Sequence, residues 1–308
     1  MPKNGTIIYD APPAPPPDAP APPTRAQAGT RLAEQPAIAL ALHGGKLYAL
    51  SAIDAIAAQV DPATGAVTEL DRDPEKRGVP HGIVAGPDGV WWDEEAPQSH
   101  DCTLMHAEAG KSALVTVAYG ARGPLLADAK QLYVGGLRGL DRMDKKTQNI
   151  TNVGTTKRGV SDVAQDDANL YWLELSAVGA PPAIMVRDKQ TAGEARVLVK
   201  SPEIGDKIAR SLILDGDTFY WSRGDDIVAM PKAGGKITAI ASGSGMSEIV
   251  VVGANLYWIE RDEVLMRAPK AGGTPVTVGF ADHAAGLVSD GKTLYWGTPY
   301  ELRKLTSP

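Results

Sequence analysis

The sequence predicts an all-β repeat protein, and three observations support this prediction. A short motif of apolar and aromatic residues recurs seven times along the 308 residues. Each repeat also contains four short apolar stretches separated by turn-forming residues. The last repeat stops one stretch early, whereas a strand-like stretch without a repeat of its own precedes the first one. Together these observations indicate a closed ring of small sheets.

The recurring motif is an apolar residue followed by aromatic residues, as in "LYW" and "FYW". All six tryptophans of the chain lie within it. Such a regular supply of the largest side chains means that one structural position is filled again and again. The central residues, at spacings of 37 to 49, are Tyr48, Trp91, Tyr133, Tyr171, Tyr220, Tyr257 and Tyr295.

Each repeat is expected to form four antiparallel strands. In the fifth repeat, "LILD" leads through the turn "GDT" into "FYWSR", and "IVAMPKAGGKITAI" supplies two more strands around a tight turn. Four short strands in about 40 residues describe one blade of a β-propeller. Neighbouring blades cover both faces of the second strand, so the apolar and Trp positions should face one neighbour and the central residue the other. The aromatic residues are therefore expected in the core.

The missing strand of the last repeat is expected to come from the other end of the chain. The last repeat supplies only "AGLVSD", "LYWGT" and "ELRKLTSP". The segment Thr30 to Glu34, "TRLAE", has no repeat of its own. We predict that it is the outermost strand of the seventh blade. The fold is then a seven-bladed β-propeller whose last blade is closed by an N-terminal strand in a 3+1 arrangement, which leaves no full-length edge open.

Two regions of different composition are expected, a proline-rich flexible arm at 1–29 and the propeller at 30–308. Between Ala11 and Pro23, eight of thirteen residues are proline. Proline removes backbone donors and fixes φ, so this stretch should be an extended spacer. Its PxxP spacings, such as Pro12 to Pro15, could instead dock on an aromatic groove.

Composition excludes several classes of function. A net charge of −6 argues against nucleic acid as a partner, which requires Lys and Arg against phosphates. No apolar run is long enough for a transmembrane segment, and no signal peptide is recognisable. The expected location is therefore cytoplasmic, or extracytoplasmic if Met1 begins a processed form. No cofactor fingerprint occurs, so no cofactor is expected.

The repeated pattern "DG.TLYW....I.R.PKAGG....L" resembles bacterial LYW and YWTD-type β-propeller repeats over about residues 30 to 308. This resemblance implies the architecture and almost nothing about activity. The second repeat alone, "PHGIVAGPDGVWWDEE", is similar to repeats of streptogramin-lyase-like seven-bladed propellers. The catalytic His and acidic residues of that family lie around the central funnel in later blades. This sequence has no matching His–Glu pair there, so the lyase activity is not carried over.

The topology of a propeller predicts where a binding site would lie. Loops that enter each first strand and leave each second strand share one face. Counting back from the central aromatic residues places four polar side chains there, and the loops after the second strands add five more. The predicted funnel residues are His81, Asp93, Glu94, Asp162, Arg210, Arg223, Glu248, Glu260 and Arg261. The alternative is that any ring-shaped fold gathers polar loops at its ends.

A metal site is not expected in the stretch "SHDCTLMH". His100, Cys102 and His106 share one face of a strand, but about 13 Å separates Cys102 from His106 at roughly 3.3 Å per residue. Zinc ligands must all lie within roughly 2.3 Å of the ion. These three side chains therefore cannot bind one ion together unless the strand folds back.

Two classes of function are left open by the sequence. In the first, the propeller is a non-catalytic platform for a protein partner or a small ligand, joined to a partner or assembly by its proline-rich arm. In the second, it is a lyase or hydrolase that uses His81 and nearby carboxylates on a small molecule. An enzyme would require a base, an acid and a reacting site within hydrogen-bond reach of one another.

Overall fold

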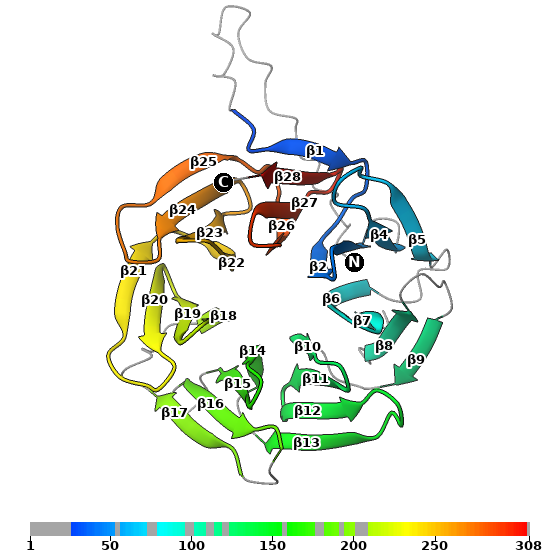
Figure 1. Cartoon of the computed structure of the whole chain (residues 1–308), viewed down its shortest axis with the longest axis vertical. Helices are drawn as coiled ribbons and strands as arrows, with labels where there is room; N and C mark the ends of the chain where they lie inside the picture. The colour runs from blue at the N-terminus through cyan, green and yellow to red at the C-terminus, as the bar shows by residue number, and fades with distance from the viewer. Residues whose placement is uncertain are drawn as a thin grey trace, which may run out of the picture.

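The chain forms a ring of seven four-stranded sheets around a central axis (Figure 1). The computed structural model describes residues 26–52, 56–72, 79–95, 102–108, 114–118, 123–155, 159–175, 182–190, 194–200 and 209–306. Every regular element in these ranges is a β-strand, and each sheet is antiparallel throughout. The predicted all-β, seven-bladed propeller is confirmed. Within the described ranges there is no helix that could span a bilayer.

The strands follow one another from the inside of the ring to the outside in each blade. Blades 1 to 4 consist of β2 (Ala39–His43), β3 (Lys46–Ser51), β4 (Ile56–Val60) and β5 (Val67–Arg72); β6 (Val79–Gly86), β7 (Gly89–Glu95), β8 (Cys102–Glu108) and β9 (Leu114–Ala118); β10 (Leu125–Ala127), β11 (Gln131–Gly136), β12 (Gly139–Asp144) and β13 (Ile150–Thr155); and β14 (Val160–Gln165), β15 (Asn169–Glu174), β16 (Ala183–Asp188) and β17 (Arg196–Lys200). Blades 5 to 7 consist of β18 (Ala209–Asp215), β19 (Thr218–Arg223), β20 (Asp226–Pro231) and β21 (Thr238–Ser242); β22 (Met246–Val252), β23 (Asn255–Glu260), β24 (Val264–Pro269) and β25 (Val276–Phe280); and β26 (Ala285–Ser289), β27 (Thr293–Gly297), β28 (Leu302–Thr306) and β1 (Thr30–Ala33).

The seventh blade is completed by the N-terminal strand, as the sequence predicts. The strand β1 is antiparallel to β28, with Thr30 opposite Lys304 and Ala33 opposite Leu302. It lies on the outside of the ring beside β28 (Figure 1). Both ends of the propeller therefore share one sheet, and the ring closes through backbone hydrogen bonds.

The residues just before β1 form backbone contacts with blade 6 as well as with blade 7. Gln27 forms a parallel bridge with Phe280 at the end of β25, the outer strand of blade 6. The Ala28 N–H donates to the Phe280 carbonyl at 2.7 Å, and Ala28 is only 3% exposed. On the other side, Arg303 in β28 donates to the carbonyls of Ala28 and Gly29. This short segment thus ties blade 6 to blade 7, and the contact with the ring begins before Thr30.

Seven apolar clusters form the core, one at each junction between neighbouring blades. At the junction of blades 5 and 6, for example, Tyr220 packs with Leu256 and Trp258 of the next blade. The central residue of each motif therefore faces the following blade, and its two flanking residues face the preceding one. This arrangement confirms that the aromatic motifs are core, and the apolar area removed from water there stabilises the ring.

The junction of blades 2 and 3 departs from this arrangement by exchanging large and small side chains. Blade 3 has Val134 where five other motifs have Trp, and blade 2 has Trp91 where the others have Tyr. Both side chains belong to the same cluster, so the larger indole from blade 2 fills space left by the valine. The indole N–H then reaches Asp88 in the turn between β6 and β7, at 3.0 Å.

Aspartates shape the turns that precede several of the aromatic strands. In blade 4, Asp166 accepts from the backbone N–H groups of Ala168 and Asn169 and from the Tyr171 hydroxyl. Asp128 and Asp290 do the same in blades 3 and 7. Each carboxylate closes an Asx-type turn with one oxygen and satisfies a buried tyrosine with the other. The aspartate-rich stretches of the sequence are therefore turn-forming.

Lysines in the turns between third and fourth strands connect one blade to the preceding one. Lys270 of blade 6 reaches Asp215 of blade 5 at 2.6 Å, and Lys232 of blade 5 reaches Asp166 of blade 4 at 3.3 Å. Both lysines come from the repeated stretch "PKAGG". That stretch therefore contributes an ion pair between blades as well as a tight turn.

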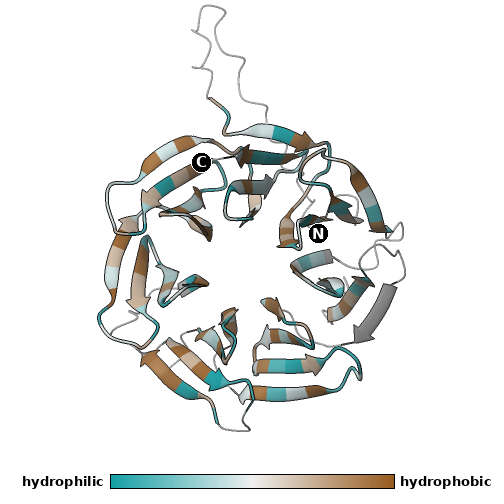
Figure 2. Ribbon diagram, in the orientation of Figure 1, coloured by the Kyte–Doolittle hydropathy of each residue, from teal (hydrophilic) through white to brown (hydrophobic). Residues whose placement is uncertain are grey.

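Four of the outer strands carry an exposed apolar residue. Brown and teal bands alternate along several of these strands (Figure 2). Val67, Ile150, Val197 and Val276 lie on outer strands and are 40 to 49% exposed. They are spread over four different blades, so they form single exposed positions of a kind that is ordinary in soluble proteins.

Candidate functional site

The propeller has two faces with different loops. The connection face carries the links between successive blades and the turns between second and third strands. The hairpin face carries the turns between first and second strands and between third and fourth strands. Because all blades have the same strand order, equivalent turns of all seven blades lie on the same face.

All nine predicted funnel residues belong to the parts of the strands and turns nearest the connection face. Four lie on innermost strands: His81 on β6, Asp162 on β14, Arg210 on β18 and Glu248 on β22. The other five lie at or near the ends of second strands: Asp93, Glu94, Arg223, Glu260 and Arg261. Hydrogen bonds and ion pairs join most of them to partners in their own blade, so they form several separate groups.

Two of the predicted carboxylates hold buried tryptophans. Glu94 accepts from the Trp92 indole at 2.8 Å, and Glu260 accepts from the Trp258 indole at 3.1 Å. In both blades the glutamate stands two residues after the tryptophan, so strand alternation places both side chains on one face. A buried indole N–H needs an acceptor, and the glutamate supplies it. These two residues stabilise the core beside the rim.

Blade 5 has Arg223 at the equivalent position and provides a matched comparison. The Trp221 indole nitrogen is buried and has no hydrogen-bond acceptor among the described residues. We expect Glu260→Ala to lower the free energy of unfolding by about 1–3 kcal/mol, because it leaves the buried Trp258 indole N–H without a hydrogen-bond acceptor. Arg223→Ala removes only a partly exposed ion pair with Asp226 and should lower it by less than about 1 kcal/mol. Urea unfolding of both variants gives the comparison, and equal losses would contradict this role of Glu260.

Asp162 joins two blades at the wall of the central channel. Its carboxylate accepts from the N–H of Leu212 in blade 5 at 2.6 Å and from its own neighbour Val163 at 2.7 Å. Burial raises the pKa of Asp162 to about 6, the charge of Glu248 adds to the rise, and the two backbone donors oppose it. The structure therefore brings Asp162 and Glu248 close enough for their charges to interact.

This shift makes stability depend on pH. The native carboxyl has a pKa near 6 and the unfolded one near 3.8, so the native state binds the proton more tightly between these values. The contribution of Asp162 to stability is therefore greatest below pH 3.8 and falls by on the order of 3 kcal/mol as pH rises to 6. We expect Asp162→Asn to remove this pH-dependent part from unfolding free energies measured between pH 4 and 7. An identical pH dependence in both proteins would contradict it.

His81 and Asp93 lie close together in blade 2 but have separate partners. The His81 Nε2 atom lies 3.1 Å from Glu95, and both side chains are about one-fifth exposed. Asp93 is buried and accepts from the backbone N–H of Gly82 at 2.6 Å. The histidine and glutamate form a candidate proton-transfer pair, and Asp93 holds the bend of β6.

The predicted arginines do not meet at a common point. Arg210 is exposed at the start of β18. Arg223 lies 3.8 Å from Asp226 at the turn between β19 and β20, and Arg261 contacts Ser244 in the link between blades 5 and 6. Arg223 and Arg261 therefore have local partners of their own.

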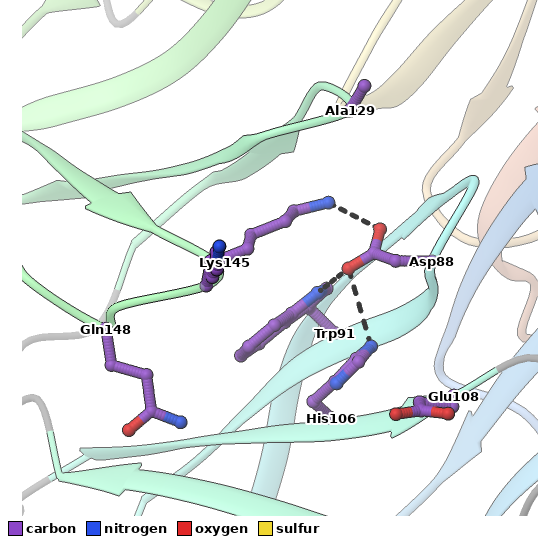
Figure 3. Close-up of a pocket in the computed structure, with 8 residues that line it drawn as sticks. Asp88, Trp91, His106, Glu108, Ala129, Lys145 and Gln148 are labelled. Carbon is purple, nitrogen blue, oxygen red and sulfur yellow. Dashed lines mark hydrogen bonds and ion pairs between the residues drawn. The ribbon is translucent and has the colours of Figure 1, made fainter.

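Sequence reasoning missed a cavity on the hairpin face, at the junction of blades 2 and 3 (Figure 3). It has a volume of about 480 Å³. Its lining residues are Asp88, Trp91, His106, Glu108, Ala129, Lys145, Lys146 and Gln148. The ring of His106 stacks on that of Trp91, with centroids 4.1 Å apart and planes 10° apart. Lys145 of blade 3 donates to Asp88 of blade 2 at 2.5 Å across the junction.

Three ionisable groups are packed together at the inner end of this cavity. Burial raises the pKa of Asp88, but hydrogen bonds from Lys145 and Trp91 outweigh it and leave that pKa below its usual value. Burial lowers the pKa of His106 by more than the charge of Asp88 raises it. At neutral pH the cavity therefore holds an ionised Asp88 beside Lys145, and a neutral His106.

A signal for this cavity is present in the sequence. The second motif is the only one with Trp at its centre, and His106 is paired with that Trp in the adjacent strand. Pairing of the second and third strands of this repeat as a hairpin puts the rings of Trp91 and His106 side by side. The sequence predicts no metal site in the stretch around His106. The described residues contain no group of three or more His, Cys, Asp and Glu side chains placed to hold a metal ion.

Comparison with known proteins identifies the fold alone. No family model matches the sequence, and no curated protein matches it. Among solved structures, the mitotic checkpoint complex contains a similar chain, with a TM-score of 0.66, 11% identity, and coverage of 97% of this chain and 99% of the other. BamB from Moraxella catarrhalis has a TM-score of 0.56 and 16% identity, and the match covers 86% of this chain and 83% of the other. For the nidogen/laminin complex the TM-score is 0.56 and the identity 12%, with 85% of this chain and 97% of the other covered. At these identities the likeness supports the β-propeller fold, whose seven blades the sheets of this chain show, and transfers no activity.

Proposed function

We propose that this chain is a non-catalytic binding platform that docks a protein partner on its connection face. The observation that carries the proposal is that the two most exposed large hydrophobic side chains of the described residues both belong to loops of this face. Leu137 is 80% exposed and Tyr300 is 77% exposed, the highest values among the large hydrophobic residues that the structure describes. Both lie in turns between second and third strands, in blades 3 and 7. Tyrosine is one of the residue types that are enriched among the anchors of protein interfaces.

The polar groups of the same face also support a platform. Glu94 and Glu260 are engaged with indole groups, and Arg223 and Arg261 with their own local partners. A set of scattered groups offers charge for the rim of an interface but no single reacting centre. Two of the similar solved structures are complexes, nidogen with laminin and the mitotic checkpoint complex. We propose that this chain is also a component of a protein complex.

The proline-rich arm is the proposed tether to that partner or assembly. Its stretch from Ala11 to Pro23 lies outside the described residues. The described chain begins at Ala26, whose carbonyl accepts from the Phe280 N–H on the outer rim. The proposed tether therefore joins the propeller at its outer rim, where Ala26 lies.

Pull-downs with three forms of the protein test the proposal. The forms are the full chain, a chain of residues 26–308, and the full chain with Leu137→Ser and Tyr300→Ser. We expect the double substitution to reduce partner recovery strongly, and removal of 1–25 to reduce recovery of the tethered assembly. Val67→Ser is the matched control, because Val67 is exposed on an outer strand. Equal recovery by all forms would contradict the proposal.

A specific observation favours an enzyme as the second candidate. The pair of His81 and Glu95 could move a proton, and it lies at the inner end of blade 2 near the connection face. A lyase or hydrolase acting on a small molecule would then lose its turnover in His81→Gln while the fold stays intact. If a substrate is found and its turnover survives this substitution, His81 is not the base.

A further inference from the structure

The two faces of the ring carry opposite charge in blades 5 to 7, which follow one another around it (Figure 1). The loops of the connection face there are 224–225, 243–245, 261–263, 281–284 and 298–301. They contain one arginine and five carboxylates, a net charge of −4. The hairpin turns of the same blades are 216–217, 232–237, 253–254, 270–275 and 290–292. They contain four lysines and two aspartates, a net charge of +2, so the face that carries Tyr300 is the acidic one.

Backbone hydrogen bonds join the acidic loops of blades 5 and 6 into one surface. The link 243–245 contacts both neighbouring turns: its first N–H donates to the Asp225 carbonyl at 2.8 Å, and its last carbonyl accepts from the Arg261 N–H at 3.0 Å. On the other side of the same turn, the Ala284 N–H donates to the Asp262 carbonyl at 2.8 Å. The charges of these loops are therefore held close to one another by the fold.

Three carboxylates of these loops are available to a partner. Asp225, Asp262 and Asp282 are exposed, and their carboxylates form no hydrogen bond or ion pair with any described residue. Glu301, in contrast, accepts from Arg303 in its own blade. Positive groups of a partner that covers this face would be attracted to the three aspartates, and the attraction strengthens as water is excluded between the two proteins.

We propose that the protein partner of the platform docks through a basic segment, one in which lysine or arginine alternates with apolar side chains. The cationic groups lie against Asp225, Asp262 and Asp282, and one of them covers the ring of Tyr300, which is 77% exposed. The inference rests on the proposed platform function and names the chemistry of its partner. A second copy of this chain would set like charges against each other on this face, which is unfavourable.

The test uses the full chain and two labelled peptides as probes. One peptide alternates arginine with leucine, and the other alternates glutamate with leucine. Fluorescence anisotropy gives the Kd of each. We expect the arginine peptide to bind, with a Kd that rises as sodium chloride is added, and the glutamate peptide not to bind. No binding of the arginine peptide, or equal binding of both, would overturn the proposal.

A triple variant assigns the binding to the acidic loops. Asp225→Asn, Asp262→Asn and Asp282→Asn together should raise the Kd of the arginine peptide by about tenfold or more. Tyr300→Ser leaves the charge unchanged and should raise the Kd severalfold, because it removes the ring that a guanidinium covers. A Kd that neither variant changes would overturn the assignment.

A second triple variant is the matched control, because it removes the same charge from exposed positions of the hairpin face. Its substitutions are Asp167→Asn, Glu194→Gln and Asp217→Asn. We expect its Kd for the arginine peptide to stay within about twofold of that of the unchanged chain, since exposed charges far apart are screened. Equal effects of the two triple variants would mean that the peptide responds only to total charge, and would overturn the proposal.

Pull-downs with the acidic-loop variant separate this inference from the platform itself. Recovery of the partner should fall both in this variant and in the chain with Leu137→Ser and Tyr300→Ser. Recovery that falls only in the latter would overturn the basic segment and leave the platform in place. Recovery that neither variant reduces would overturn the platform, and the inference with it.

Discussion

Deletion of residues 1–33 is expected to lower the free energy of unfolding by about 5 kcal/mol or more, a large part of the total stability of an ordinary domain. The deletion removes β1 from the edge of β28 and the segment that bridges to Phe280. It also exposes the apolar surface against which Ala28 and Ala33 are buried. An opened ring loses backbone pairing and apolar burial at two junctions together.

Deletion of residues 1–25 is the matched control for this experiment. It removes the proline-rich stretch and keeps Gln27, Ala28 and β1 in place. We expect urea unfolding of the shorter deletion to follow that of the full chain, while the 1–33 deletion unfolds at much lower urea. Addition of a peptide with the sequence of residues 26–36 should restore part of the lost stability. Equal midpoints for the two deletions would show that the ring does not depend on its closing strand.

Trp258→Ala is expected to lower the free energy of unfolding by about 3–5 kcal/mol, the range found for truncation of large aromatic residues in close-packed cores. Trp258 is fully buried between blades 5 and 6, in the same cluster as Tyr220 and Leu256. Its removal leaves a cavity between two rigid sheets and an unused carboxylate at Glu260. The loss should appear as a lower Tm in calorimetry.

An exposed aromatic residue provides the control for Trp258. Tyr300 is 77% exposed in the turn between β27 and β28. We expect Tyr300→Ala to change the free energy of unfolding by less than about 0.5 kcal/mol, as for most exposed positions. Similar losses for the two alanine variants would mean that the junction between blades can collapse around the missing indole.

The closing strand shows how much of the fold could be predicted from the residues alone. Seven motifs, each in a unit of four strands, leave one strand missing, and "TRLAE" was the segment without a place. The structure has β1 at Thr30–Ala33, one residue shorter than the predicted Thr30–Glu34. The bridge from Gln27 to Phe280 was not predicted, because a single parallel contact has no repeat or periodicity to reveal it.

For the funnel residues, the sequence pattern predicted their positions in the fold but not their hydrogen-bond partners. The loops after the second strands placed Glu94 and Glu260 near the connection face, and the structure has them at the ends of β7 and β23. Counting could not show that their carboxylates accept from the indoles of Trp92 and Trp258, although the spacing of two residues along a strand was visible. Whether the nine residues bind a ligand stays a prediction.

The sequence by itself determined the number of blades, the order of strands and the burial of the aromatic residues between neighbouring blades. These features repeat, and a period of two along a strand and about 40 along the chain can be counted without coordinates. Only the tertiary structure decided which side chains from different blades meet. Asp88 and Lys145 are 57 residues apart, and their contact across the cavity beside His106 depends on how neighbouring blades pack. Contacts of that kind follow from the packing of two surfaces, so they cannot be counted along one chain.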